Sequence, residues 1–231
     1  AHLAASAAAA ATALVSPDVG AAAADWLATR HSVPAAVSPL GLPLGLRGTE
    51  RWLRAVGAGA GVAADAIDRV IAEEESRFFI SMRYGLRDEV YAARVAHLPG
   101  QAFAVVADGT VALSWTRLLH EEFGMRPALV ACHAPVDARA EELAAWWQGA
   151  RAGQVELTGP TPHDVRDALA RVRPALVLGS SVERDLARDM DAAFLHIVHP
   201  NTHYVTFTDA PFLGYHGLSR VAEMVLNLLA R

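Results

Sequence analysis

The chain has 231 residues, 53% of them hydrophobic, which is enough to bury one large core or two small ones. Its formal net charge of −5 argues against a nucleic-acid partner, because such partners need a basic face. No apolar run reaches the roughly 18 residues of a membrane span, since Arg, Asp or Pro interrupts each one.

The first third of the chain alternates short β-type runs with helical runs. Residues 1–15 are Ala-rich and lack the basic region that opens a signal peptide, so we expect a helix that runs into a strand. The elements expected up to residue 99 are a strand at 13–15, a helix at 18–30, a strand at 34–37, a helix from Thr49 to Val56 with Thr49 as its cap, a long connecting helix from Val62, and a mostly helical stretch at 77–99 with a break near Gly85.

After Pro99 and Gly100 the alternation becomes regular. The expected strands are 102–107, 128–131, 154–157, 175–178 and 194–198, and the helices between and after them end near Phe123, Trp147, Val172, Met190 and Leu229. Strands that alternate with helices imply right-handed βαβ units and parallel sheets covered on both faces. The predicted fold class is therefore α/β, with two Rossmann-like parallel-sheet domains linked by a long helix. We assign residues 1–85, with the linking helix, to the first domain and residues 86–231 to the second.

Several polar residues follow predicted strands directly, where parallel sheets bind their ligands. Ser180 and Ser181 place hydroxyls and free N–H groups at the positive end of a helix, which suits an anion or the edge of a cofactor. A simple helix N-cap is the alternative, and it is the commoner role of serine there. Asp108, before Gly109 and Thr110, has the same two interpretations. It does not open a dinucleotide-binding fingerprint, because the second and third glycines of that motif are missing.

The segment 199–217 is unusually polar for so apolar a chain. His196, His199 and His203 are spaced by three and four residues, a spacing typical of metal ligands on one helix face. These histidines instead follow a strand and flank a proline, so we predict no metal site. The favoured interpretation is a polar pocket or interface lined by His199, His203 and Tyr215, and a solvated loop is the alternative.

Cys132 is the only cysteine of the chain. A single thiol excludes an internal disulfide and an iron–sulfur cluster held by this chain's thiolates alone, since such clusters need about four. We expect Cys132 to behave as a small buried hydrophobe at the end of a strand.

Four segments, taken in order, resemble one family. They are SPLGLPLGLRGTERWLRAVGAGAG at 38–61, PGQAFAVVADGTVALSWTRLLHEEFGMRPALVACH at 99–133, RPALVLGSSVERDLARDM at 173–190 and VHPNTHYVTFTDAPFLGYHGLSRVAEMVLNLL at 198–229. They resemble the Pro-Gly turn and helix, the strand–Asp–helix–strand unit, the Gly-Ser-Ser turn and the closing Pro loop, Gly-Tyr-x-Gly turn and helix of nitrogenase component 1 and its relatives. The spacing from Pro200 to Tyr215 resembles most the β-type subunit.

This resemblance implies a C-terminal portion that lacks the N-terminal domain whose cysteines hold the family's iron–sulfur cluster. It implies a cytoplasmic oxidoreductase subunit that pairs with a homologous α-type subunit and receives electrons from an ATP-dependent iron–sulfur reductase. The full complex would hold an iron–sulfur cluster or metallocluster, while this chain alone would hold neither and would be inactive. In several members a metallocluster or tetrapyrrole lies between the Rossmann-like domains, which would place Asp108, Ser180, Ser181, His199, His203 and Tyr215 on the wall of that cleft.

Two other classes of function stay open at this point. The family that the chain resembles also includes the scaffolds on which a metallocluster precursor is assembled, and this is the second hypothesis after the enzyme subunit. Pairs of Rossmann-like lobes joined by a helix also serve as modules that bind metals or tetrapyrroles.

The first prediction follows from the cysteine content. Purified without partners, the chain should contain no iron–sulfur cluster, because one thiol cannot replace the several that such clusters need. Chemical determination of iron and acid-labile sulfide tests this, and stoichiometric amounts of both would contradict it.

Overall fold

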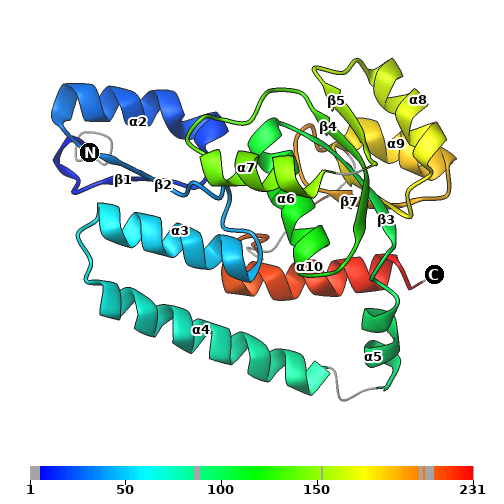
Figure 1. Cartoon of the computed structure of the whole chain (residues 1–231), viewed down its shortest axis with the longest axis horizontal. Coiled ribbons are helices and arrows are strands. Elements are labelled where there is room, and N and C mark those ends of the chain that lie inside the picture. Colours follow the sequence, from blue (N-terminus) through cyan, green and yellow to red (C-terminus); the bar gives the residue numbers. More distant parts are fainter. Residues whose placement is uncertain (1–5, 86–88, 152, 203–204, 206–210, 231) are drawn as a thin grey trace.

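The described part of the chain folds as an α/β protein with two parallel sheets, which confirms the predicted fold class. The computed structural model describes residues 6–85, 89–151, 153–202, 205 and 211–230. Among these residues a five-stranded sheet has the strand order β5-β4-β3-β6-β7, a two-stranded sheet pairs β1 with β2, and every pairing is parallel. The two sheets lie at opposite ends of the molecule (Figure 1).

The larger sheet follows the regular second part of the sequence. Its elements are β3 (Ala102–Ala107), α6 (Gly109–Glu121), β4 (Arg126–Cys132), α7 (Glu141–Ala150), β5 (Val155–Thr158), α8 (Pro162–Val172), β6 (Leu176–Gly179), α9 (Ser181–Asp189) and β7 (Ala193–His196). Strand β3 is buried along almost its whole length, as expected for an apolar run at the centre of a parallel sheet.

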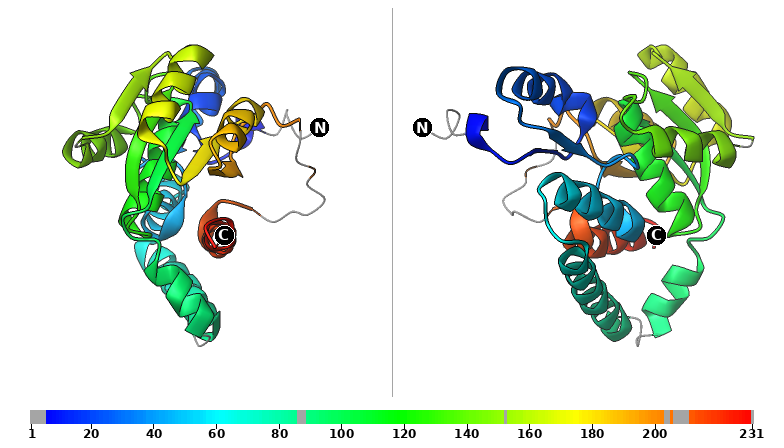
Figure 2. Two further views of the ribbon diagram at one scale, coloured as in Figure 1. Left: turned by 90° about the vertical axis from the view of Figure 1, so that its right-hand side faces the viewer. Right: turned by 60° about the vertical axis from the view of Figure 1, so that its left-hand side comes forward.

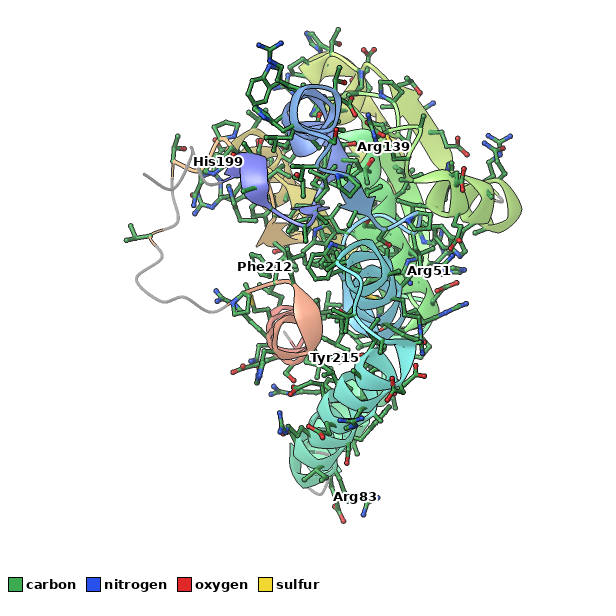
Figure 3. All side chains as sticks on the ribbon, turned by 90° about the vertical axis from the view of Figure 1, so that its left-hand side faces the viewer. Arg51, Arg83, Arg139, His199, Phe212 and Tyr215 are labelled. Carbon is green, nitrogen blue, oxygen red and sulfur yellow. The ribbon has the colours of Figure 1, made fainter. Side chains whose placement is uncertain are left out.

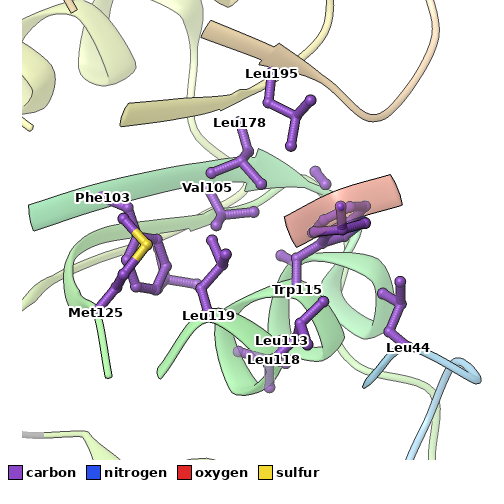
Figure 4. Packing of buried hydrophobic residues seen from close by; sticks show 14 of the residues in the cluster. Leu44, Phe103, Val105, Leu113, Trp115, Leu118, Leu119, Met125, Leu178 and Leu195 are labelled. Carbon is purple, nitrogen blue, oxygen red and sulfur yellow. The ribbon is translucent and has the colours of Figure 1, made fainter. Parts of the chain in front are cut away.

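Alternate residues of the strands build two cores, one on each face of this sheet. Phe103 and Val105 pack on one face with Leu119 of α6 and with α10 (Figure 4). Ala104 and Val106 point to the opposite face, where α8 and α9 cover them. The period of two along each strand thus places helices on both sides.

The first part of the chain is smaller. It consists of a 3-10 turn η1 (Ser6–Ala8), β1 (Thr12–Leu14), α2 (Pro17–His31), β2 (Ala35–Val37), α3 (Gly45–Gly59) and α4 (Ala64–Gly85), after which α5 (Glu89–Ala96) leads into β3. The predicted break near Gly85 is confirmed, because α4 ends there. An α-helix was expected before the first strand; of that stretch, residues 1–5 lie outside the described residues and Ser6–Ala8 forms a 3-10 turn.

The last helix, α10 (Gly214–Leu228), contacts both parts of the molecule. It returns under the larger sheet to pack against α3 and α4 (Figure 2). Leu218, Val221 and Val225 on α10 belong to the main core, and so does Leu44, which immediately precedes α3. The division of the chain at residue 85 stays a prediction, and α10 belongs by sequence to the second part although it packs on the first.

Two expected helix starts were wrong, for different reasons. Helix α3 begins at Gly45 and not at Thr49, whose hydroxyl lies inside the helix and donates to the carbonyl of Gly45 at 2.6 Å. Its first turn is instead capped from a distance, since the amide of Leu46 donates to a carboxylate oxygen of Glu122 at 3.0 Å. Helix α10, expected from Leu218 after the Gly-Tyr-x-Gly turn, begins at Gly214, so that turn is its first turn.

Among the described helices, none is both long enough and apolar enough to cross a membrane.

The glycines at the start of α10 give the second prediction. Gly214 has φ of +74°, and a Cβ on Gly217 would lie 2.2 Å from the carbonyl carbon of Phe212. We expect Gly214→Val and Gly217→Val each to lower the free energy of unfolding by about 1–3 kcal/mol, through backbone strain and steric overlap respectively. Urea unfolding measures the loss. Gly149→Val is the control, because nothing lies within 4 Å of the Cβ position there and its φ is not positive.

Candidate functional site

A crevice of about 310 Å³ lies where the order of the larger sheet changes direction. From β3 the chain moves first to β4 on one side and later to β6 on the other, and ligands of such sheets bind beyond the strand ends at this switch point. The crevice is lined by Asp108, His133, Ser180, Glu183, His199 and Pro200, among others. The fold therefore brings together three of the candidate residues, Asp108, Ser180 and His199.

Ser180 and Ser181 are both buried, and their hydroxyls are engaged by the protein itself. Ser180 caps α9: its hydroxyl donates to Glu183 at 2.7 Å and accepts from the amide of Val182 at 3.2 Å. The hydroxyl of Ser181 accepts from the amide of Thr202 at 2.8 Å, and its amide donates to the carbonyl of Pro200 at 2.9 Å. The two serines thus fix the wall of the crevice and the start of the loop after β7, and a direct contact with a ligand stays a prediction.

Asp108 is exposed and occupies the N-cap position of α6 without a side-chain cap bond. The cap is supplied instead by Asp18 of α2, which accepts from the amide of Thr110 at 3.2 Å and from its hydroxyl at 2.5 Å. Burial raises the pKa of Asp18, against these two hydrogen bonds, and the nearby charges of Asp108 and Asp137 raise it further. The carboxylate of Asp108 is left facing the crevice.

His199 lies at the junction of two hollows. It lines the crevice and also a groove of about 1180 Å³ that runs between β7, α9 and α10. His199 is exposed, and the peptide bond between it and Pro200 is cis. His203 lies outside the described residues.

Tyr215 lies apart from this cluster. Figure 3 shows it at the start of α10, separated from His199. The ring is 7% exposed and lines neither the crevice nor the groove, and its hydroxyl has no hydrogen-bond partner among the described residues. Burial raises its pKa, and the charges of Glu75, Glu50 and Glu74 add to that shift. A cleft role of Tyr215 stays a prediction, and in this structure α10, whose first turn carries Tyr215, packs against α3 and α4.

The residues present do not fit an iron–sulfur cluster. Burial raises the pKa of the Cys132 thiol to about 11, with smaller contributions from Glu156, Asp108 and Asp18, so the thiolate that a cluster needs is disfavoured. Within the described ranges, no group of three or more His, Cys, Asp or Glu side chains could hold a metal ion.

Sequence reasoning missed several residues of these hollows. Glu183 could have been found from the sequence, since Ser180 and Glu183 have the spacing of a capping box. The walls of the groove could not be predicted from the sequence, because Arg184 of α9 and Arg220 of α10 line the same groove only in the folded chain. The pairing of Asp18 with Thr110 joins residues 92 positions apart.

Comparison with known proteins decides the family. A family model described as nitrogenase component 1 type oxidoreductase matches residues 1–230. The chain belongs to this family.

Curated proteins resemble the chain over part of their length. The B subunit of the light-independent protochlorophyllide reductase of Gloeothece citriformis is 30% identical over 139 residues, which is 57% of this chain and 25% of the relative. Its counterpart in a Picosynechococcus species is 24% identical over 193 residues, which is 80% of this chain and 35% of the relative. The chain therefore spans about a quarter to a third of these relatives.

A solved structure of nitrogenase Cp1 at pH 6.5 has the same fold. It superposes with a TM-score of 0.69 at 20% identity and covers 90% of this chain and 42% of that chain.

The third prediction concerns Asp18. A raised pKa means that ionising Asp18 costs stability in the folded state, a cost absent below its unfolded pKa and complete above its folded one. Asp18→Asn keeps an oxygen for Thr110 and removes the charge. The variant should therefore be at least as stable as the wild type at pH 7, and its advantage should shrink on acidification. Melting temperatures of both proteins across pH measure this, and an advantage that grows toward low pH would contradict it.

Asp18→Ala provides the contrast. It removes the cap of α6 altogether and should lower stability by about 1 kcal/mol at neutral pH.

Proposed function

We propose that this chain is the C-terminal portion of a β-type subunit of a nitrogenase-like oxidoreductase. It shapes one wall of the cleft in which the complete enzyme holds a metallocluster or tetrapyrrole. The subunit pairs with a homologous α-type subunit and takes electrons from an ATP-dependent iron–sulfur reductase. The complete protein works in the cytoplasm, where that reductase has ATP.

The observation that carries this proposal is the position of His199. In a chain that belongs to the nitrogenase component 1 family, this exposed imidazole stands beyond the carboxyl ends of the central strands, between the crevice and the groove. Asp108 faces the same crevice with a second titratable group. Polar side chains that converge at a sheet switch point are the usual mark of a ligand wall.

The chain contributes shape and polar contacts, and it does not store electrons. Its partly buried Cys132 is a poor cluster ligand, so the iron–sulfur centres of the proposed enzyme belong to other parts of the complex. The groups that this portion supplies to the cleft are the imidazole of His199, the carboxylate of Asp108 and the loop that Ser181 anchors.

The fourth prediction tests His199 in the assembled enzyme. The complete subunit, its partner subunit and the reductase are combined with ATP, a reductant and protochlorophyllide, the substrate in the names of the curated relatives. His199→Ala should lower the ATP-dependent rate at least about tenfold, because a positioning contact is lost. It should leave the melting temperature unchanged, because the side chain is exposed.

His97→Ala is the matched control, since His97 is also exposed and lines neither hollow. His203→Ala, measured in the same turnover assay, completes the comparison. An unchanged rate in the His199 variant would make the loop a solvated connection. A fall in melting temperature as large as that of Gly217→Val would make His199 structural. If the wild-type complex shows no turnover but transfers a metallocluster to an apo-enzyme, the protein is an assembly scaffold.

A further inference from the structure

Strand β7 is the last strand of the larger sheet, and one of its edges is unpaired in the described part of the chain. The amides of Ala193 and Ile197 donate to Ala175 and Gly179, on the side of β6. In a strand, successive residues turn their backbone groups to opposite edges. The N–H and C=O groups of Phe194 and His196 therefore point away from β6, toward the unpaired edge.

The groove of about 1180 Å³ runs along this edge. Residues of β7, namely Phe194, Leu195 and His196, line it together with α9 on one side and α10 on the other. Figure 2 shows α9 and α10 on opposite sides of β7. A doubly wound sheet places its strands between two helix layers in this way, so the groove has the geometry of a further strand position.

The two walls of the groove differ in chemistry. Helix α9 supplies Arg184 and Arg188, with Asp191 just after its end, and α10 supplies the apolar Met224 and Leu228 beside the opposite charges of Arg220 and Glu223. Arg188 pairs with Asp185 and Asp189, at 3.2 and 3.7 Å. Those two carboxylates line a separate hollow, so the α9 wall of the groove carries two guanidinium groups against the one carboxylate of Asp191.

One buried polar atom also lies at this edge without a partner. The Nε2 atom of His196 is inaccessible to solvent and has no hydrogen-bond partner among the described residues. Unpaired buried polar atoms are uncommon in native proteins and call for an explanation. His196 lines the groove, so this nitrogen lies beside the unpaired edge of β7.

We propose that the unpaired edge of β7 binds an extended segment of a partner polypeptide, which adds to the sheet as a sixth strand. Acidic side chains of that segment face Arg184 and Arg188, and apolar side chains face Met224 and Leu228. The charge of the α9 wall selects the acidic character, and the period of two of a strand places the two kinds of side chain on opposite faces. This binding site runs along β7, while the proposed reaction rests on the crevice; the two hollows share Val198 and His199.

The test uses the whole chain and a labelled peptide of alternating Glu and Val with blocked ends. We expect saturable binding in fluorescence anisotropy. Hydrogen exchange at the amides of Phe194 and His196 should be fast in the free protein and slow in the complex, because bonds to the added strand protect them. Slow exchange of these amides in the free protein would overturn the proposal, since the chain itself would then cover the edge.

Two N-methylated peptides separate strand addition from simple charge attraction. Methyl groups on the Glu nitrogens and on the Val nitrogens block opposite edges of the peptide strand. We expect one of the two to bind at least about tenfold more weakly than the parent and the other to bind like it. Equal binding by both peptides would overturn the proposal.

Two charge variants test whether the arginines of α9 bind the acidic side chains of the peptide. Arg184→Glu should weaken binding by at least about tenfold. Arg171→Glu should not, since Arg171 is exposed on α8 and lines none of these hollows. A Lys-Val peptide that binds as tightly as the Glu-Val peptide would exclude the acidic partner, and melting curves show that each variant is folded.

Discussion

The attachment of the first part of the chain to α6 positions most of the other elements of the structure. Helix α6 is buried along most of its length and holds the preceding segments by polar contacts as well as by packing. Ser114 accepts from the amide of Leu42 at 3.1 Å, and Arg117 donates to the carbonyl of Leu44 at 2.9 Å. Farther along, Glu122 caps α3. These bonds set where α3 lies and hence the surface on which α10 packs.

The attachment requires the guanidinium of Arg117 to be buried, which is energetically unfavourable. Its side chain is 1% exposed, and burial lowers its pKa, against the opposing charges of Glu121 and Glu122. A buried guanidinium is tolerated only when its donors are satisfied, and its bond to Leu44 and its ion pair with Glu121 at 3.3 Å do much of this. Removing Glu121 would leave the charge of Arg117 buried without a partner, and removing Arg117 would leave the carbonyl of Leu44 buried without a donor. These contacts therefore hold the two segments in one relative position.

The same attachment builds the site. Asp18 reaches α6 from α2 and satisfies the free amide of Thr110, so Asp108 is not needed as the cap and its carboxylate faces the crevice. On the other side, the position of α10 opens the groove beside β7. His199 joins the two hollows because the loop that carries it is fixed to α9 through Ser181. The walls of the two hollows thus follow from how the two parts are held together.

The α/β class, the parallel strands and the capping box of α9 could be predicted from the sequence, because each is encoded by near neighbours. The apolar run at 102–107 could only be a buried strand of a covered sheet, and Ser180 with Glu183 marks a helix start. Tertiary structure alone decided the start of α3, which depends on Glu122, 76 residues from Leu46. It also decided that Asp108 and His199 share a crevice while Tyr215 does not. Such contacts depend on how whole elements pack, and no local pattern records that packing.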